Sequence, residues 1–295
     1  MRDNFSTFHP VINFMYFFVI IAFSMIFMHP ICIAISLICA VFYSIYLNGM
    51  RAVKFICLYM LPLFLIFVIF NAAVNHAGVS IILYVNDNPI TRESIFYGIA
   101  AASTFVSVMI WFSCFNTIMT SDKFTYLFGR IIPVLSLIFS MVLRTVPRLK
   151  AQAKIISNSQ KCIGRDVSNG NIFSRIKNGI KIMSILITWA FENALETADS
   201  MKSRGYGLKG RTSFSNYRFD NRDMISLVLI LICTITIIIL SALGINKVVY
   251  FPAIYMRPIT VHSNILFGSY LLLGMFPLIF NLVENIKWIY IRSKI

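Results

Sequence analysis

The chain has 295 residues, of which 58% are hydrophobic and only 13% charged, whereas an average soluble domain has roughly 25% charged residues. Its mean hydropathy is +0.79. This composition excludes an ordinary soluble globular domain and indicates a membrane protein. The formal net charge of +15 is the one feature that could suggest nucleic-acid binding, but that function needs a soluble basic face, which the apolar pattern does not provide.

Long uncharged apolar runs predict membrane-spanning helices. About 20 apolar residues are needed for a helix to cross the hydrocarbon layer, and these runs are continuous rather than alternating, which excludes barrel strands. The His29-Pro30 pair divides the first run, because proline disfavours helix at the residue before it. We expect this run to be retained as spans rather than removed as a signal peptide, since it has no basic segment beyond Arg2 and no A-x-A site. The sequence predicts six spans, at about residues 11–29, 31–49, 55–75, 95–119, 224–244 and 263–284.

The distribution of Lys and Arg predicts the orientation. If the N-terminus is cytoplasmic, the outer segments are residues 28–30, 76–94 and 245–262. These segments hold only Arg92, Lys247 and Arg257, and the other 23 of the 26 basic residues fall on the inner side. Because cytoplasmic loops are enriched in Lys and Arg, we expect a multi-pass protein of a prokaryotic cell membrane with both termini cytoplasmic. This topology also explains the net charge without nucleic acid.

Residues 120–222 differ from the spans because their apolar residues recur at steps of three and four among many charges. A first amphipathic helix is predicted from residue 131, bent at Pro147, and a second over about residues 172–201, with a length of about 45 Å. The segment GRDVSNGN between them indicates a turn. The two helices could pack their apolar stripes together; these stripes include Leu135, Phe139 and Val142 in the first helix and Ile176, Ile180, Met183 and Ile187 in the second.

The predicted fold class is therefore all-α. It is a polytopic membrane protein with about six transmembrane helices and a cytoplasmic hairpin of two long amphipathic helices. Three regions follow in chain order: transmembrane helices over residues 1–119, the cytoplasmic helices over 120–222, and the last transmembrane helices over 223–295.

The end of the second amphipathic helix combines a cation with a glycine, in the order Lys202, Ser203, Arg204 and Gly205. A glycine just beyond a helix and a basic residue in its last turn are common features of a helix C-terminus. A cationic helix end on the inner face could also bind anionic lipid or dock into an acidic cleft of another protein. Docking agrees better with a single arginine presented on a defined backbone.

The segment ETADSMKSRGYGLKGRTSF around this helix end resembles the second arginine motif of the transmembrane T component of energy-coupling factor (ECF) transporters. That family also contains the corresponding subunit of cobalt and nickel importers. Ser200 and Lys202 depart from its motif. The matching residues are Met201, Ser203, Arg204, Gly205, Tyr206, Gly207, Arg211 and Thr212. The resemblance extends upstream through VLRTVPRLKAQAKIISNSQKCIG.

The family's first arginine motif, Q-x-x-R-G, is altered in this chain. The aligned residues are Gln160, Lys161, Cys162, Ile163 and Gly164, so isoleucine replaces the arginine, with Lys161 and Arg165 on either side. Either a neighbouring cation takes over the role of the arginine, or this helix end docks through an apolar contact.

The resemblance implies a function and a set of contact residues. T components couple two cytoplasmic ATPase subunits, identical or different, to one membrane-embedded substrate-binding S component, so the implied function is the coupling subunit of an ATP-driven micronutrient importer. Its substrate would be a vitamin, a vitamin precursor or a metal ion. The implied ATPase-docking residues are Gln160, Lys161, Ile163, Gly164, Arg165, Ser203, Arg204 and Gly205. The seven stripe residues named above, three in the first helix and four in the second, would contact the S component or the other helix of the hairpin.

The chain itself is not expected to be an enzyme, to bind a metal or to need a cofactor. It has no G-x-x-x-x-G-K-[ST] motif, so partner subunits would hydrolyse ATP. Glu192, Glu196 and Asp199 have no His or Cys near them in the pattern. The two alternatives are a secondary transporter or channel, which would need ionisable groups at mid-membrane, and a membrane enzyme or anchor, which would show clustered titratable residues. The sequence shows neither feature, which counts against both.

Overall fold

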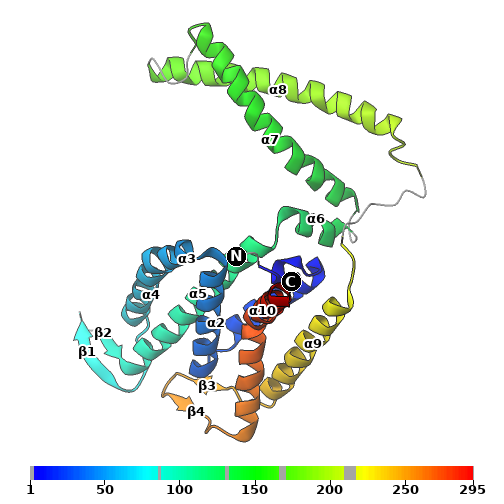
Figure 1. The fold of residues 1–295 in the computed structure, drawn as a ribbon. Coiled ribbons are helices and arrows are strands. Elements are labelled where there is room, and N and C mark those ends of the chain that lie inside the picture. The colour runs from blue at the N-terminus through cyan, green and yellow to red at the C-terminus, as the bar shows by residue number, and fades with distance from the viewer. Residues whose placement is uncertain (1–2, 86–87, 130–132, 166–170, 209–216, 295) are drawn as a thin grey trace. The chain divides into compact units, whose positions relative to one another are not determined.

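A computed structural model describes residues 3–85, 88–129, 133–165, 171–208 and 217–294 (Figure 1). The chain divides into two compact units. We call the first, Met1–Thr120 with Tyr217–Ile295, the bundle unit, and the second, Ser121–Asn216, the long-helix unit.

The bundle unit consists of long apolar helices, and the predicted all-α polytopic class is confirmed. Among the described residues, five helical segments are long and apolar enough to cross a membrane, and α1 (Pro10–Ile26) is a shorter apolar helix of 17 residues. The five are α2 (Pro30–Asn48); the continuous segment α3 (Met50–Phe55), η2 (Ile56–Met60) and α4 (Leu61–Val74); α5 (Arg92–Ile118); α9 (Asn221–Ala242); and α10 (Val261–Lys294). A short 3-10 helix, η1 (Phe5–Thr7), precedes α1.

The turn predicted around Pro30 separates α1 from α2. The imidazole Nδ1 of His29 accepts a hydrogen bond from the backbone N–H of Ile31 at 3.3 Å, and Pro30 occupies the first position of α2. Proline is favoured there because that position needs no N–H donor. The same His-Pro arrangement, with His9 and Pro10, begins α1.

The core of the bundle unit is aromatic and contains a buried hydrogen-bonded network. Ser36 Oγ lies 2.7 Å from Ser24 Oγ and accepts a hydrogen bond from Trp111 Nε1 at 3.1 Å, and the Tyr270 hydroxyl lies 3.1 Å from Ser24 Oγ. These four side chains come from α1, α2, α5 and α10. Because buried polar groups are costly unless they are paired, the network fixes how these helices are aligned.

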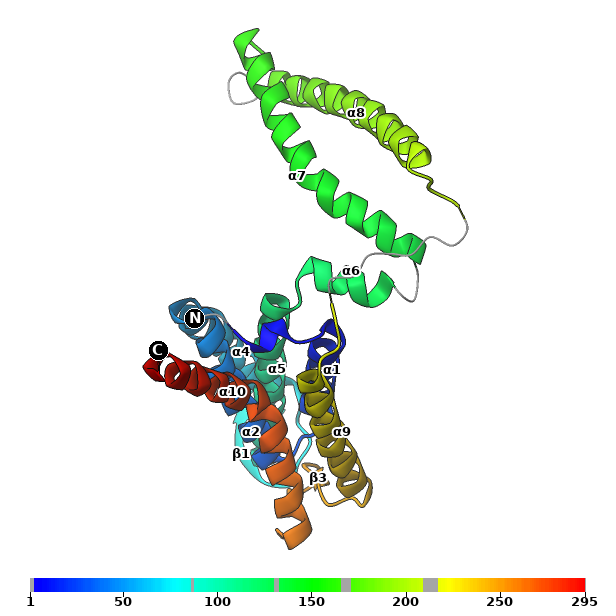
Figure 2. The same ribbon diagram turned by 45° about the vertical axis from the view of Figure 1, so that its right-hand side comes forward.

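Two short β-hairpins at one end of the bundle unit were not predicted. β1 (Ile81–Val85) pairs with β2 (Asn88–Thr91), and β3 (Val248–Val249) pairs with β4 (Tyr255–Met256). The Tyr250 hydroxyl donates to the Met28 carbonyl at 2.7 Å, which ties the α1–α2 turn to the same end. The three segments expected on the outer side therefore share what we call the hairpin end, and both termini lie toward the opposite end (Figures 1 and 2).

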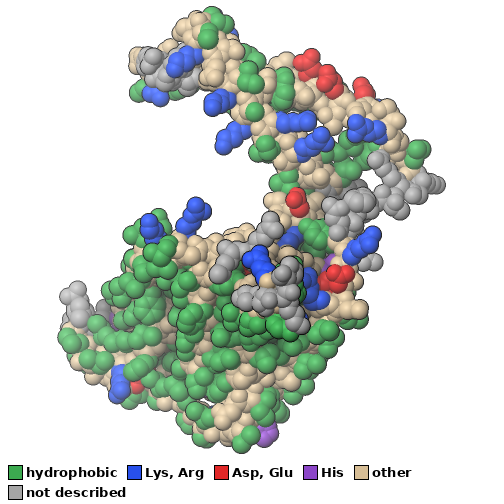
Figure 3. All heavy atoms as spheres, in the orientation of Figure 1, with side chains coloured by type: hydrophobic (Ala, Val, Ile, Leu, Met, Phe, Trp, Pro, Cys, Tyr) green, Lys and Arg blue, Asp and Glu red, His purple; other side chains and the backbone are tan. Residues whose placement is uncertain are grey.

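The surface of the bundle unit agrees with a membrane environment. Figure 3 shows hydrophobic side chains over most of its visible face. Exposed large apolar residues occur on every spanning helix, among them Phe18, Phe42, Ile66, Phe105, Ile232 and Leu272. Exposed apolar surface of this extent is unusual for a soluble monomer and is expected for helices that face lipid.

The long-helix unit contains α6 (Ser121–Gly129), α7 (Pro133–Cys162) and α8 (Ile172–Ser203). α8 has 32 residues, close to the predicted length, and α7 continues through Pro147. The apolar stripes that could have packed on each other are exposed in this structure. The helices approach each other where α7 ends and α8 begins, and then diverge (Figures 1 and 2). Ile156 is the one buried apolar side chain among those described in this unit.

Candidate functional site

The end of α8 has a well-defined backbone cap. The N–H of Gly205 donates to the Lys202 carbonyl at 3.0 Å, and the N–H of Tyr206 donates to the Met201 carbonyl at 3.0 Å. This pair of hydrogen bonds is the Schellman motif, in which the first residue after the cap has a left-handed conformation. Gly205 has φ +78°, so the sequence needs glycine at this position. Arg204 is then the C-cap residue.

The end of α7 has the same cap. The N–H of Gly164 donates to the Lys161 carbonyl at 3.0 Å, the N–H of Arg165 donates to the Gln160 carbonyl at 2.9 Å, and Gly164 has φ +79°. Each hydrogen bond has its counterpart at the end of α8, and the glycine φ angles differ by only 1°. The backbone therefore places Ile163 in the position that Arg204 occupies at the other helix end. This equivalence supports the alignment of the two motifs.

The side chains at the two capped ends are mostly directed outward. Ile163 is 66% exposed, and Ser203 and Arg204 are also exposed. The Ser203 hydroxyl donates to the Ser200 carbonyl of its own helix at 2.9 Å. Gln160 is an exception, because its side-chain Oε1 is buried and has no hydrogen-bond partner in the described part of the chain. Each end thus presents one C-cap side chain, isoleucine or arginine, on a backbone held by the hydrogen bonds of the cap.

The two capped ends lie far apart. α7 ends beside the first turns of α8 (Figures 1 and 2), and the second capped end follows the last turn of α8. At about 1.5 Å per residue, the 32 residues of α8 separate the two ends by roughly 48 Å. One small cleft cannot accommodate both ends, so any docking partner must offer two separate sites.

The apolar stripes between the two ends are exposed. On α7, Phe139 and Val142 are about half exposed, and on α8 the exposed fraction ranges from 50% at Ile187 to 65% at Ile180, with Ile176 and Met183 between them. Leu135 belongs to α7, but its side chain lies outside the described part. An apolar surface of this length on a helix pair indicates contact with a partner protein or with lipid.

Two motif residues, Arg211 and Thr212, lie outside the described residues. Within the described part of the chain, no group of three or more His, Cys, Asp or Glu side chains is placed to hold a metal ion. What the sequence reasoning missed is the shared cap geometry. The signal was present in the two glycines, Gly164 and Gly205, because each is the residue directly after the C-cap of a long amphipathic helix.

The fold and these surfaces define a polytopic helical membrane protein that carries two long amphipathic helices with exposed apolar stripes and matching capped ends. The chain belongs to the CbiQ family of cobalt transport proteins, whose pattern matches residues 4–214. The family match spans α1 to α8 and includes both capped ends. It confirms the resemblance drawn from the sequence.

Curated relatives carry names that agree with the family. The energy-coupling factor transporter transmembrane protein EcfT of Lactococcus lactis subsp. cremoris (strain MG1363) is 38% identical over 108 residues, which are 36% of this chain and 41% of that protein. EcfT of Staphylococcus aureus (strain 04-02981) is 38% identical over 112 residues, 38% of this chain and 42% of that protein. An uncharacterized Mycoplasma pneumoniae protein, the MG181 homolog, is 32% identical over 112 residues, 38% of this chain and 26% of that protein. The chain thus spans about two fifths of the length of the EcfT relatives.

Proposed function

We propose that this protein is the transmembrane coupling component of an ATP-driven ECF-type importer of a micronutrient, with both termini on the cytoplasmic side. In this role α7 and α8 are coupling helices. Two cytoplasmic ATPase subunits bind the capped ends, and a substrate-binding S component in the membrane packs on the exposed apolar stripes. The substrate class is a vitamin, a vitamin precursor or a metal ion.

The observation that carries the proposal is the pair of matching caps on two helix ends about 48 Å apart. A single helix end with this geometry is ordinary, because many helices end in a Schellman motif. Two such ends on connected helices, each exposing its C-cap side chain, suit a partner with two related binding sites. A pair of ATPase subunits is a partner of this kind.

Two docked ends on one helix pair reinforce each other. Once the first end is bound, the second is held near its own site, which raises its effective concentration without any new contact. The rigid backbone at each cap also limits the conformational entropy lost on binding. Movement of the ATPase subunits on nucleotide binding would then move α7 and α8, and the S component packed on their apolar stripes would move with them.

The test is charge reversal at the α8 end. Arg204→Glu should leave the protein folded, because Arg204 is exposed, but should weaken ATPase binding at least about 30-fold, since losing one partner of a buried charged pair costs about 2–5 kcal/mol. Binding is measured by co-purification of the chain with its ATPase subunits and by substrate uptake in vesicles. Lys181→Glu is the matched control, because it makes the same charge reversal on an exposed residue of α8 away from the capped end. If Arg204→Glu assembles and transports like the wild type, the coupling role of this helix end is wrong.

A further inference from the structure

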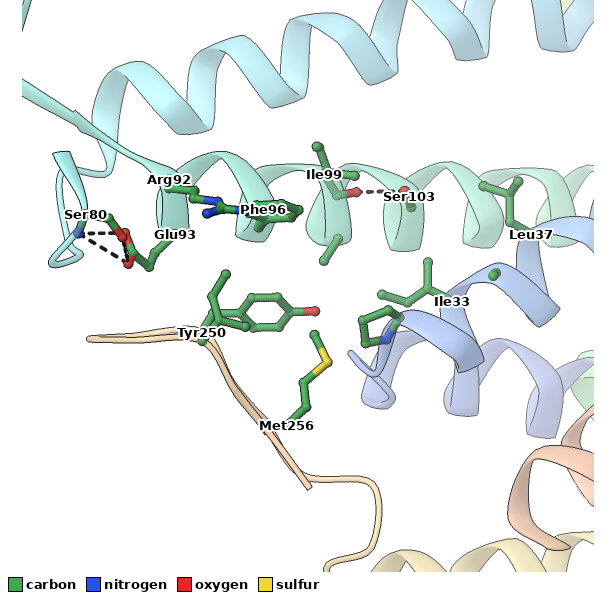
Figure 4. A pocket seen from close by; sticks show the side chains of 14 residues that line it. Ile33, Leu37, Ser80, Arg92, Glu93, Phe96, Ile99, Ser103, Tyr250 and Met256 are labelled. Carbon is green, nitrogen blue, oxygen red and sulfur yellow. Dashed lines mark hydrogen bonds between the residues drawn. The ribbon is translucent and has the colours of Figure 1, made fainter. Parts of the chain in front are cut away.

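A cavity of about 610 Å³ opens at the hairpin end of the bundle unit, and the capped ends have no part in it. Its walls are the first turns of α2 and α5, and the segments around Ser80 and Tyr250 cover it (Figure 4). The volume is within the usual range of ligand pockets, which is roughly 300–1,000 Å³. Most of the lining is apolar, including Ile33, Leu37, Phe96, Ile99, Ile254 and Met256.

The polar side chains of the cavity are satisfied by the protein, with one exception. Glu93 accepts hydrogen bonds from the backbone N–H and the hydroxyl of Ser80, the Ser103 hydroxyl donates to the Ile99 carbonyl, and the Tyr250 hydroxyl donates to the Met28 carbonyl. These groups therefore need no ligand.

The exception is Arg92, which is exposed at the mouth of the cavity. Its guanidinium lies 5.5 Å from the centre of the Phe96 ring, and Figure 4 shows it beside that ring while Glu93 is directed toward Ser80. Within the described part of the chain, no carboxylate lies within ion-pair distance of the guanidinium. The Phe96 ring holds the cation at the boundary between the polar mouth and the apolar interior.

The depth of the cavity matches one leaflet of a bilayer. From Arg92 to Ser103 the α5 wall has eleven steps of about 1.5 Å, so it extends roughly 16 Å from the helix end. Half of a hydrocarbon layer about 30 Å thick is about 15 Å. With the start of α5 at the membrane surface, the cation would lie at the level of the lipid headgroups and the apolar wall at the level of the acyl chains. A ligand that fits must carry an anion at one end and hydrocarbon along the rest.

We propose that this cavity binds one anionic phospholipid, with its phosphate on Arg92 and one acyl chain along Ile33, Leu37 and Ile99. Arginine suits this role because its planar guanidinium can make two parallel hydrogen bonds to a phosphate. The lipid would fill the space between α2 and α5 and would stabilise the packing of the hairpin end against these helices.

The experiment is native mass spectrometry of the full-length chain in detergent with an equimolar mixture of phosphatidylglycerol and phosphatidylcholine. The wild type should retain one phosphatidylglycerol in preference to phosphatidylcholine. Arg92→Gln should lower the retained phosphatidylglycerol about fivefold, the effect expected for one basic residue near anionic lipid. Arg257→Gln is the matched control, since it removes an exposed cation from the same end without touching the cavity lining, and it should retain the lipid.

A second variant tests the apolar part of the cavity. Ala34 is exposed on the α2 wall, so Ala34→Trp should fill the cavity without disturbing the core and should reduce retention of both lipids. Ser103→Leu narrows the same space from α5 and replaces Ala34→Trp if that variant does not fold. An excess of glycerol phosphate should not displace the lipid. The proposal would be overturned if Arg92→Gln retained as much phosphatidylglycerol as the wild type, or if Arg257→Gln lost as much as Arg92→Gln. It would also be overturned if the filled variant retained the lipids unchanged, or if glycerol phosphate displaced the lipid.

Discussion

Arg222, in the first turn of α9, joins three segments of the bundle unit, and we predict that Arg222→Ala lowers the free energy of unfolding by about 2 kcal/mol. Its Nη1 donates to Glu284 Oε1 of α10 at 3.1 Å, and its Nη2 donates to the Thr7 hydroxyl of η1 at 3.3 Å. The guanidinium also lies 4.6 Å from the centre of the Phe8 ring. The alanine variant removes all of these contacts at once.

The magnitude follows from the exposure of the groups. Arg222 and Glu284 are 37% and 23% exposed, so solvent screens the ion pair and it contributes only about 0.5–1 kcal/mol. The cation–π contact with Phe8 adds about 0.5–1 kcal/mol, and the hydrogen bond to Thr7 about 0.5 kcal/mol. Together these terms give about 2 kcal/mol, with the ion pair as the part that depends on salt.

The assay is equilibrium unfolding in detergent for the wild type, Arg222→Ala, Glu284→Ala and the double variant. The double-mutant cycle should give a coupling energy of about 0.5–1 kcal/mol that decreases in 1 M salt, while the remaining loss in Arg222→Ala should persist. Arg222→Lys keeps the charge but loses the planar fork, so it should recover only part of the stability. A loss below 0.5 kcal/mol in Arg222→Ala, or a coupling energy of zero at low salt, would refute this account of the contact.

Three further predictions concern the helix ends and the core. Gly205→Ala should accelerate hydrogen exchange at the end of α8 about fivefold, because φ +78° costs an alanine about 1 kcal/mol. Gly179→Ala, inside the same helix, should slow exchange instead; equal effects of the two variants would contradict the role of Gly205 in the C-terminal cap. Burial lowers the pKa of His29, so the unfolded state binds the proton more readily and stability should fall as pH decreases below about 6.5. Burial also lowers the pKa of His9, so His29→Asn, which keeps a capping side chain, should reduce this fall in a thermal unfolding series, and an unchanged slope would exclude a contribution from His29. Ser36→Ala should lower the free energy of unfolding by about 1–3 kcal/mol, because Ser36 belongs to the buried hydrogen-bonded network. Ser103→Ala, outside that network, should lower it by less than about 0.5 kcal/mol; similar losses in the two variants would contradict a stabilising role of the network.

The spanning helices could be predicted because their signal is local. An uncharged run of about 20 residues has few stable alternatives to a transmembrane helix, and Pro30 marks the boundary between the first two spans, whereas Pro277 lies inside α10. The break at His29-Pro30 and the long amphipathic helices before Gly164 and Gly205 were therefore visible in the sequence. The β1–β2 hairpin was not predicted, although Ile81–Val85 is rich in β-branched residues and precedes a turn-forming segment, because the sequence defined residues 76–94 only as an outer segment between two spans.

The partners of the apolar stripes could not be predicted. Periodicity shows which face of a helix is apolar, but several surfaces can cover such a face with similar energy, including the second helix of the hairpin, lipid or another protein. Ile176 and Ile180 were expected to contact either the S component or the other helix of the hairpin; α7 and α8 diverge from the end where they meet and leave both residues exposed. The pairing of Arg222 with Glu284 joins residues 62 positions apart, and no local pattern indicates such a contact.

The matching caps make the difference between Ile163 and Arg204 informative about the partner. Because both backbones end in the same way, the two docking sites of the proposed function would meet the same main-chain shape and would differ only in what faces the C-cap side chain. If the ATPase subunits are identical, one groove must accept both isoleucine and arginine, and Ile163→Arg should assemble as well as the wild type or better. If they differ, the groove at Ile163 can be apolar, and a buried unpaired guanidinium there would weaken assembly strongly, as such charges cost several kcal/mol. Co-purification of Ile163→Arg with its ATPase subunits therefore distinguishes a symmetric from an asymmetric pair, whereas Arg204→Glu weakens binding in either case.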